Sequence, residues 1–169
     1  MVSENLIIDE ARQHWEAGQA LEAGRILFEH LPEEARPNWA ANVLALAARH
    51  FPTIPEVENV QAIAKSPDTH IWLEAKEAFH QVRALTLRVE RQGPQEQLCF
   101  LLLAENTAKL TYNSFRQPAW VEEFAPPLSG FDADAGWWIA ANARCIVDAL
   151  DDTEFTNVPW DTLVAPYRV

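Results

Sequence analysis

The sequence predicts an all-α fold of six or seven helices in one bundle-like domain spanning residues 1–169. In every strongly apolar window the apolar residues recur at the spacing of one helix face, and the alternating pattern of a strand is nearly absent. Apolar residues make up 49% of the chain and charged residues 22%, which is ordinary globular usage. A chain of 169 residues suits one domain that buries roughly 70% of its unfolded surface.

The segment Gly93–Gln117 is the predicted centre of the fold. It carries the most apolar run in the chain, residues 98–104 (LCFLLLA), and becomes polar in part from Glu105 onward. A helix that is apolar on all sides is normally surrounded by other helices. We therefore expect a central helix that is buried at its start and meets polar groups toward its end.

The preceding segment, Pro67–Gln92, has the clearest helical pattern. Its apolar residues recur at i, i+4 and i+7 and should face the core: Ile71, Ala75, Ala78, Val82, Leu85 and Val89, widened by Phe79 and Thr86. Gly93 and Pro94 leave only a very short connection to the central helix. The two helices should therefore form an antiparallel pair.

The first 31 residues predict a helical hairpin. Ser3 or Asn5 can cap its first helix, and Gly18 ends or bends that helix. The string WEAGQALEAGRILFEHL resembles one helical hairpin of the tetratricopeptide kind, with a small residue at the turn (Gly18), an alanine five residues on (Ala23) and a later leucine (Leu31). The match covers about half of one repeat, and no second copy follows at the 34-residue period. The resemblance implies a helical hairpin, and a plain antiparallel hairpin explains the same residues. Residues 1–50 should either pack on the other helices or extend as a small lobe.

Prolines divide the rest of the chain. A third helix should run from Pro37 toward Phe51, and a short one over Glu56–Lys65. Residues 118–129 should be an ordered, proline-rich loop, and residues 151–169 an irregular strap. Asp132 and Asp134 can cap a last long helix over 135–150, whose expected core face is Trp138, Ile139, Cys145, Ile146, Ala149 and Leu150.

The acidic charge excludes some partners. Thirteen Lys and Arg against 25 Asp and Glu give a formal charge of -12, which repels nucleic-acid backbones and anionic membranes. It favours solubility and a basic protein partner. The sequence leaves the oligomeric state open.

The N-terminus lacks the charged and apolar regions of a signal peptide, and no apolar run approaches the ~20 residues of a membrane span. We therefore expect a cytoplasmic protein. In a reducing compartment Cys99 and Cys145, on apolar faces of two predicted helices, should be buried free thiols rather than a disulfide or redox pair.

One segment has metal-ligand residue types: His70, Glu74, Glu77 and His80. The E-x-x-H spacing of Glu77 and His80 occurs in carboxylate-bridged metal bundles. A di-iron site needs this motif twice, and the sequence contains it once. Because this side lies opposite the apolar stripe, we expect a solvated charged face and no metal. No cofactor is predicted.

The polar half of the central helix is the main candidate site. Glu105 and Lys109 are spaced i, i+4, and Asn142 on the last helix also needs a buried partner. Three interpretations remain: a satisfied structural network, an exposed face, or a ligand pocket. The candidate residues are Glu105, Asn106, Lys109, Tyr112, Asn113, Trp137, Asn142 and Arg144.

Trp137 and Trp138 are adjacent and cannot face the same way. We expect Trp138 in the core and Trp137 on the polar face beside Arg144. There Trp137 either serves as an interface anchor or is covered by the 118–129 loop or the C-terminal tail. We favour cover by the loop.

No phosphate loop, nucleophile elbow, zinc-protease motif or dinucleotide fingerprint occurs, and the chain has only five glycines. The sequence therefore favours a non-catalytic protein-interaction module of adaptor, regulatory or immunity type. The alternative is a small-molecule-binding or enzymatic helical domain with a polar pocket around Glu105–Asn113.

Overall fold

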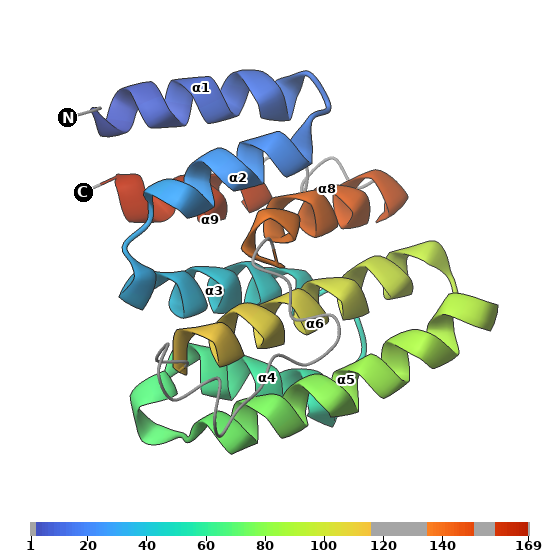
Figure 1. Ribbon diagram of the computed structural model, residues 1–169. Coiled ribbons are helices and arrows are strands. Elements are labelled where there is room, and N and C mark those ends of the chain that lie inside the picture. Colours follow the sequence, from blue (N-terminus) through green and yellow to red (C-terminus); the bar gives the residue numbers. More distant parts are fainter. Residues whose placement is uncertain (1–2, 116–134, 151–157, 169) are drawn as a thin grey trace.

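A computed structural model describes residues 3–115, 135–150 and 158–168 (Figure 1). All regular structure in these ranges is helical, which confirms the all-α prediction. The helices are α1 (Glu4–Glu16), α2 (Ala20–His30), α3 (Arg36–Ala48), α4 (Pro55–Lys65), α5 (Trp72–Gln92), α6 (Gln95–Phe115), α8 (Trp138–Leu150) and α9 (Val158–Val164). Short 3-10 turns η1 (Glu33–Ala35), η2 (Pro67–Thr69), η3 (Ala135–Trp137) and η4 (Ala165–Tyr167) join or extend them.

Helix α6 is the centre of the fold, as the sequence predicts. It packs against α3, α4, α5 and α8, and buried side chains occur along it from Cys99 to Tyr112. Helices α5 and α6 form the expected antiparallel pair, with only Gly93 and Pro94 between them (Figure 1). Because helices surround α6, the apolar first half of α6 needs no exposed face.

Helices α1 and α2 form the expected N-terminal hairpin. The Ser3 hydroxyl accepts a hydrogen bond from the Leu6 N–H at 3.3 Å, so Ser3 rather than Asn5 is the N-cap. Gly18 has a φ of +80°, a left-handed conformation that glycine adopts without a side-chain clash. Helix α2 packs on α8, and the hairpin's buried side chains belong to the same hydrophobic cluster as those of α6.

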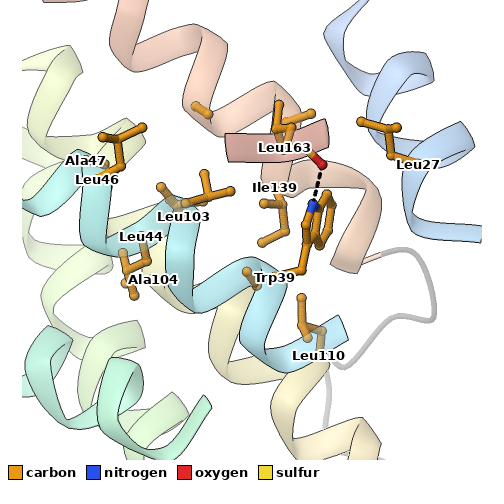
Figure 2. Packing of buried hydrophobic residues seen from close by; sticks show 14 of the residues in the cluster. Leu27, Trp39, Leu44, Leu46, Ala47, Leu103, Ala104, Leu110, Ile139 and Leu163 are labelled. Carbon is orange, nitrogen blue, oxygen red and sulfur yellow. Dashed lines mark hydrogen bonds between the residues drawn. The ribbon is translucent and has the colours of Figure 1, made fainter. Parts of the chain in front are cut away.

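The C-terminal segment is helical, so the prediction of an irregular strap is wrong for residues 158–168. Trp160, Leu163, Val164 and Tyr167 are buried at helical spacing. The indole of Trp39 donates a hydrogen bond to the Leu163 carbonyl at 2.9 Å (Figure 2). The Tyr167 hydroxyl donates to the Leu27 carbonyl, and burial raises the pKa of Tyr167. Two prolines and polar neighbours masked this short apolar stripe in the sequence.

Helix α5 begins later than predicted. A 3-10 turn covers Pro67–Thr69, and Ile71 is the extended N-cap of α5, with 58% of its surface exposed. Its expected core position is therefore wrong, because a residue outside the helix does not share the helix's angular spacing. The remaining stripe is correct: Ala75, Ala78, Phe79, Val82 and Thr86 are buried, and Leu85 and Val89 pack against the core.

The core face of α8 differs from the predicted one. Ile139 and Ile146 are buried as expected, but Trp138 is 42% exposed and Trp137 is half-buried. Ala149 is exposed, and the buried face includes Ala140, Ala143 and Val147 instead. The prediction placed the core face of α8 at the large apolar side chain of Trp138, whereas small residues of α8 make the contact with the core.

Those small residues allow a close contact between α2 and the start of α8. A Cβ atom placed on Gly24 would lie 2.3 Å from the Trp137 carbonyl oxygen and 3.0 Å from the Ala140 Cβ. Backbone cannot rotate away as a side chain can. Glycine at this position in α2 is therefore a packing requirement.

Gly24→Ala should lower the free energy of unfolding by about 1–3 kcal/mol, the usual cost of overpacking. This result would oppose helix propensity, which favours alanine over glycine by about 1 kcal/mol. Urea unfolding of the two proteins measures the difference. A variant as stable as the wild type would contradict the close contact.

The predicted loop over 118–129 and the caps Asp132 and Asp134 lie outside the described residues. Leu150, expected in the α8 core face, has no described side chain. Within the helices that are described, none combines the length and apolar character needed to cross a membrane.

Candidate functional site

The polar second half of α6 is buried. Glu105 is 2% exposed and Asn106 is 8% exposed, while Thr107, Thr111 and Tyr112 are almost completely enclosed. The Thr107 hydroxyl donates to the Leu103 carbonyl at 2.8 Å, and the Thr111 hydroxyl to the Thr107 carbonyl at 2.7 Å. These hydroxyls are satisfied by their own helix, one turn back.

Glu105 lies between two cations. Arg83 Nη1 donates to its carboxylate at 3.1 Å, and Lys109 Nζ lies 3.7 Å from its second oxygen. The Lys109 side chain is only 13% exposed, and its ammonium lies 5.7 Å from the centre of the Phe79 ring. Lys109 is thus largely buried and is held beside Glu105.

Arg83 was missed as a member of this cluster, although the sequence contained a signal for it. Arg83 and Glu105 lie eleven positions before and after Pro94, at the turn between α5 and α6. In an antiparallel hairpin, residues equally far from the turn lie side by side. Phe79 and Lys109 obey the same relation, at fifteen positions on either side.

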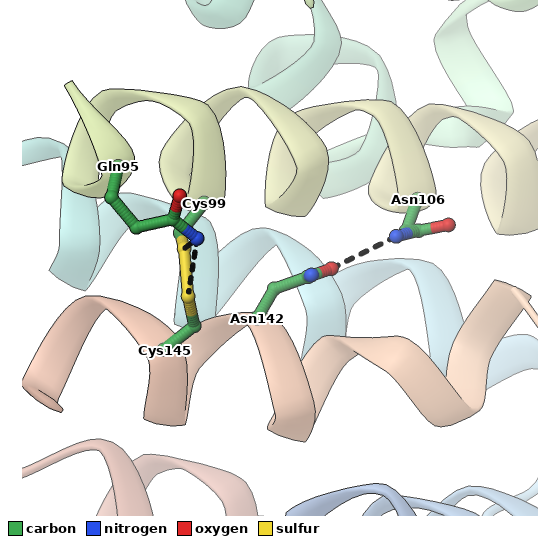
Figure 3. The surroundings of a disulfide bond; sticks show 5 residues. All are labelled: Gln95, Cys99, Asn106, Asn142 and Cys145. Carbon is green, nitrogen blue, oxygen red and sulfur yellow. Dashed lines mark hydrogen bonds between the residues drawn. A yellow bond between two sulfur atoms is a disulfide. The ribbon is translucent and has the colours of Figure 1, made fainter. Parts of the chain in front are cut away.

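A second polar contact joins α6 to α8. The Asn106 side-chain N–H donates to the side-chain oxygen of Asn142 (Oδ1) at 2.8 Å (Figure 3). Both side chains are buried, so each supplies the partner that the other needs. The buried partner expected for Asn142 is therefore Asn106.

The other predicted site residues lie in different surroundings. Tyr112 is buried with its ring edge-on to Trp72, and Asn113 is half-buried in the last turn of α6. Arg144 contacts α1 and its own helix. It lies over the Trp15 ring at 5.0 Å and donates to the Trp15 carbonyl at 3.1 Å and to Asp148 at 3.2 Å.

The two cysteines form a disulfide, so the prediction of two free thiols is wrong. Cys99 on α6 and Cys145 on α8 are bonded, with their Cα atoms 6.0 Å apart (Figure 3). This separation is typical of a disulfide. The sequence placed both cysteines on apolar helix faces, but it could not show that these two helices pack together at this level.

An open groove of about 530 Å³ lies beside the disulfide, between the start of α2, the start of α6 and one side of α8. Its apolar lining comes from Ala20, Leu21, Ala141 and Ala149. Its polar lining comes from Gln95, Arg144 and Asp148, and Cys145 also lines it. This groove was not predicted, because it depends on how the hairpin packs on α8.

The predicted metal-ligand types lie on an exposed surface. Glu74 accepts from the Ile71 N–H at 3.1 Å and contacts His70 Nδ1 at 2.9 Å. The Ile71 hydrogen bond, with His70 beside it, holds the pKa of Glu74 below its ordinary value. Glu77 and His80 are exposed, and the described residues contain no group of three His, Cys, Asp or Glu side chains placed to hold a metal ion.

Comparisons of the chain with protein-family models, with curated proteins and with solved structures find no match.

Proposed function

We propose that the chain is a non-catalytic protein-interaction module, of adaptor, regulatory or immunity type, that binds a basic partner protein. The observation that supports this proposal most strongly is the uneven distribution of charge. Residues 3–34 contain eight acidic residues and two arginines, a formal charge of −6, whereas α5 contains three acidic and four basic residues. Helices α1 and α5 lie at opposite edges of the molecule (Figure 1).

Helix α1 would supply the acidic face. We use this name for its exposed carboxylates, Glu4, Asp9, Glu10 and Glu16. Among the ion pairs of the described residues, none involves these four side chains. The one arginine of α1, Arg12, lies 5.7 Å over the Trp160 ring. The carboxylates of this face are therefore available to attract a basic surface and to speed its association.

The alternative function, a polar pocket around Glu105–Asn113, has less support. Glu105 contacts Arg83 and Lys109, and Asn106 contacts Asn142. Side chains that satisfy one another leave fewer groups for a ligand. Of the three interpretations of the polar half of α6, these contacts favour a structural network over an exposed face or a ligand pocket.

A cytoplasmic location is part of the proposal, and the disulfide places a condition on it. Reducing compartments keep most protein thiols reduced, whereas disulfides persist in oxidising ones. A cytoplasmic chain would therefore exchange its Cys99–Cys145 disulfide with cellular thiols. The ratio of oxidised to reduced chain, trapped by rapid alkylation in cells, reports the compartment.

Neutralising the acidic face should slow partner association. In a variant with Asp9→Asn, Glu10→Gln and Glu16→Gln, we expect the association rate at low salt to fall by about tenfold, since steering supplies factors of 10 or more. The partner is first captured with the tagged chain, identified by mass spectrometry and purified. Stopped-flow mixing then gives the rates.

A matched variant removes the same charge elsewhere: Glu58→Gln, Glu77→Gln and Glu90→Gln, all exposed on α4 and α5. Its association rate should stay within about twofold of the wild type. The wild-type rate should fall as salt rises, because the Debye length shortens from ~10 Å at 0.1 M to ~3 Å at 1 M. Equal effects of the two variants, or a rate indifferent to salt, would contradict the proposal.

A further inference from the structure

We infer that the Cys99–Cys145 disulfide is a reversible thiol–disulfide exchange site, which an external dithiol attacks at the Cys145 sulfur through the groove beside α8. This inference goes beyond the proposed interaction function and does not depend on it. It assigns a modification site, a class of reactant and a direction of attack.

The first observation is the unequal exposure of the two cysteines. Cys99 is 2% exposed and faces the core from α6, whereas Cys145 is half-buried and lines the groove. Disulfide exchange requires a thiolate to reach one of the two sulfur atoms. The groove, with a volume of about 530 Å³, gives this access to Cys145.

The second observation is the side chain of Gln95, in the first turn of α6. Its amide nitrogen lies 3.7 Å from Cys99 Sγ and 3.8 Å from Cys145 Sγ (Figure 3). An N–H donor beside a sulfur atom stabilises the thiolate more than the neutral thiol. Gln95 is thus placed to stabilise the sulfur that leaves.

The exchange balances with a dithiol as the reductant. One thiolate of the dithiol bonds to Cys145 Sγ, the bond to Cys99 breaks, and Cys99 leaves as a thiolate that takes a proton from water. The second thiolate of the dithiol then attacks the dithiol's first sulfur, which is bonded to Cys145 Sγ, and releases the Cys145 thiolate. Cys99 and Cys145 gain two electrons, and the dithiol becomes a disulfide.

Reduction changes how α6 is held to α8. In the oxidised chain the two helices are joined by the disulfide near the start of α6 and by the Asn106–Asn142 hydrogen bond further along. After reduction no covalent bond holds the start of α6 to α8. The groove, which is built from both helices and α2, is the part of the molecule most directly affected.

Trapping the mixed disulfide identifies the attacked sulfur. Oxidised protein is mixed with glutathione, a monothiol that forms the mixed disulfide but does not resolve it efficiently. The reaction is quenched early with acid, the protein is unfolded, and its free thiols are alkylated with excess N-ethylmaleimide near neutral pH before the peptides are mapped by mass spectrometry. We expect glutathione on Cys145 and N-ethylmaleimide on Cys99. Glutathione mainly on Cys99, or evenly on both, would overturn the inference, as would purified protein that resists oxidation to the disulfide.

Blocking the groove tests the route. Ala149 is exposed, lines the groove and lies one helical turn beyond Cys145. Ala149→Trp should slow reduction by dithiothreitol at least about fivefold, whereas Ala84→Trp, at an exposed site on α5, should change the rate by less than about twofold. Circular dichroism confirms that both variants are folded. Equal rates for the two variants would overturn the inference.

The urea dependence of the wild-type rate supplies a test that needs no variant. Attack through an existing groove should be nearly independent of urea well below the unfolding transition. Attack that requires unfolding should accelerate steeply with urea, because the open population then grows exponentially. A steep dependence would overturn the inference even if the tryptophan variants behaved as expected.

Discussion

Removing both cations around Glu105, with Arg83→Ala and Lys109→Met, should lower the free energy of unfolding by about 3–5 kcal/mol. Glu105 is 2% exposed, and a buried carboxylate left without its partners costs this much. An exposed ion pair would be worth only about 0–1 kcal/mol. Urea unfolding measures the loss.

Four further variants separate the effect of charge from the effect of side-chain volume. Each single change should cost less than the double change, because one cation remains beside Glu105. Lys109→Met should cost less than Lys109→Ala, since methionine fills the space over Phe79. Adding Glu105→Leu to the double variant should recover most of the lost stability, because an apolar replacement of a buried ionic cluster is often neutral. A loss below about 1 kcal/mol in the double variant would place this cluster in solvent.

Removing the disulfide, with Cys99→Ala and Cys145→Ala, should lower the free energy of unfolding by about 4 kcal/mol. The bridge joins residues 46 positions apart, and a loop of this length is expected to restrict the unfolded chain by that amount. Urea unfolding of the oxidised protein, the reduced protein and the double variant gives the comparison.

The reduced protein and the double variant should agree within about 1 kcal/mol, because Cys→Ala leaves little space unfilled. A loss below about 1 kcal/mol in both would show that the cross-link does not stabilise the fold. A large loss only in the double variant would assign the effect to packing of Cys99 rather than to the bond.

The sequence predicted the centre of the fold well because local signals agree there. The apolar stripe of α5, the Gly93-Pro94 turn and the apolar start of α6 each indicate the same antiparallel pair. The register of that pair then follows from the distance to the turn, which places Arg83 beside Glu105. Long, periodic helices joined by a short turn leave few alternatives.

The sequence-based predictions are wrong where tertiary packing, rather than a local pattern, determines the structure. The face of α8 is set by the close approach of Gly24 and Ala140, and an apolarity pattern weights Trp138 more heavily than either. The disulfide depends on the packing of α6 against α8, which no local pattern records. The groove has the same cause, since its walls come from three helices distant in sequence.

We propose that the polar residues of α6 hold the fold together and that recognition belongs to the outer acidic face. The direct test is the dissociation constant of the purified partner, measured by calorimetry for two variants. The triple variant Arg83→Ala, Lys109→Met and Glu105→Leu should bind within about twofold of the wild type. The variant Asp9→Asn, Glu10→Gln and Glu16→Gln should bind at least about tenfold more weakly at low salt. The reverse order, with binding lost in the α6 variant and kept in the α1 variant, would contradict the claim.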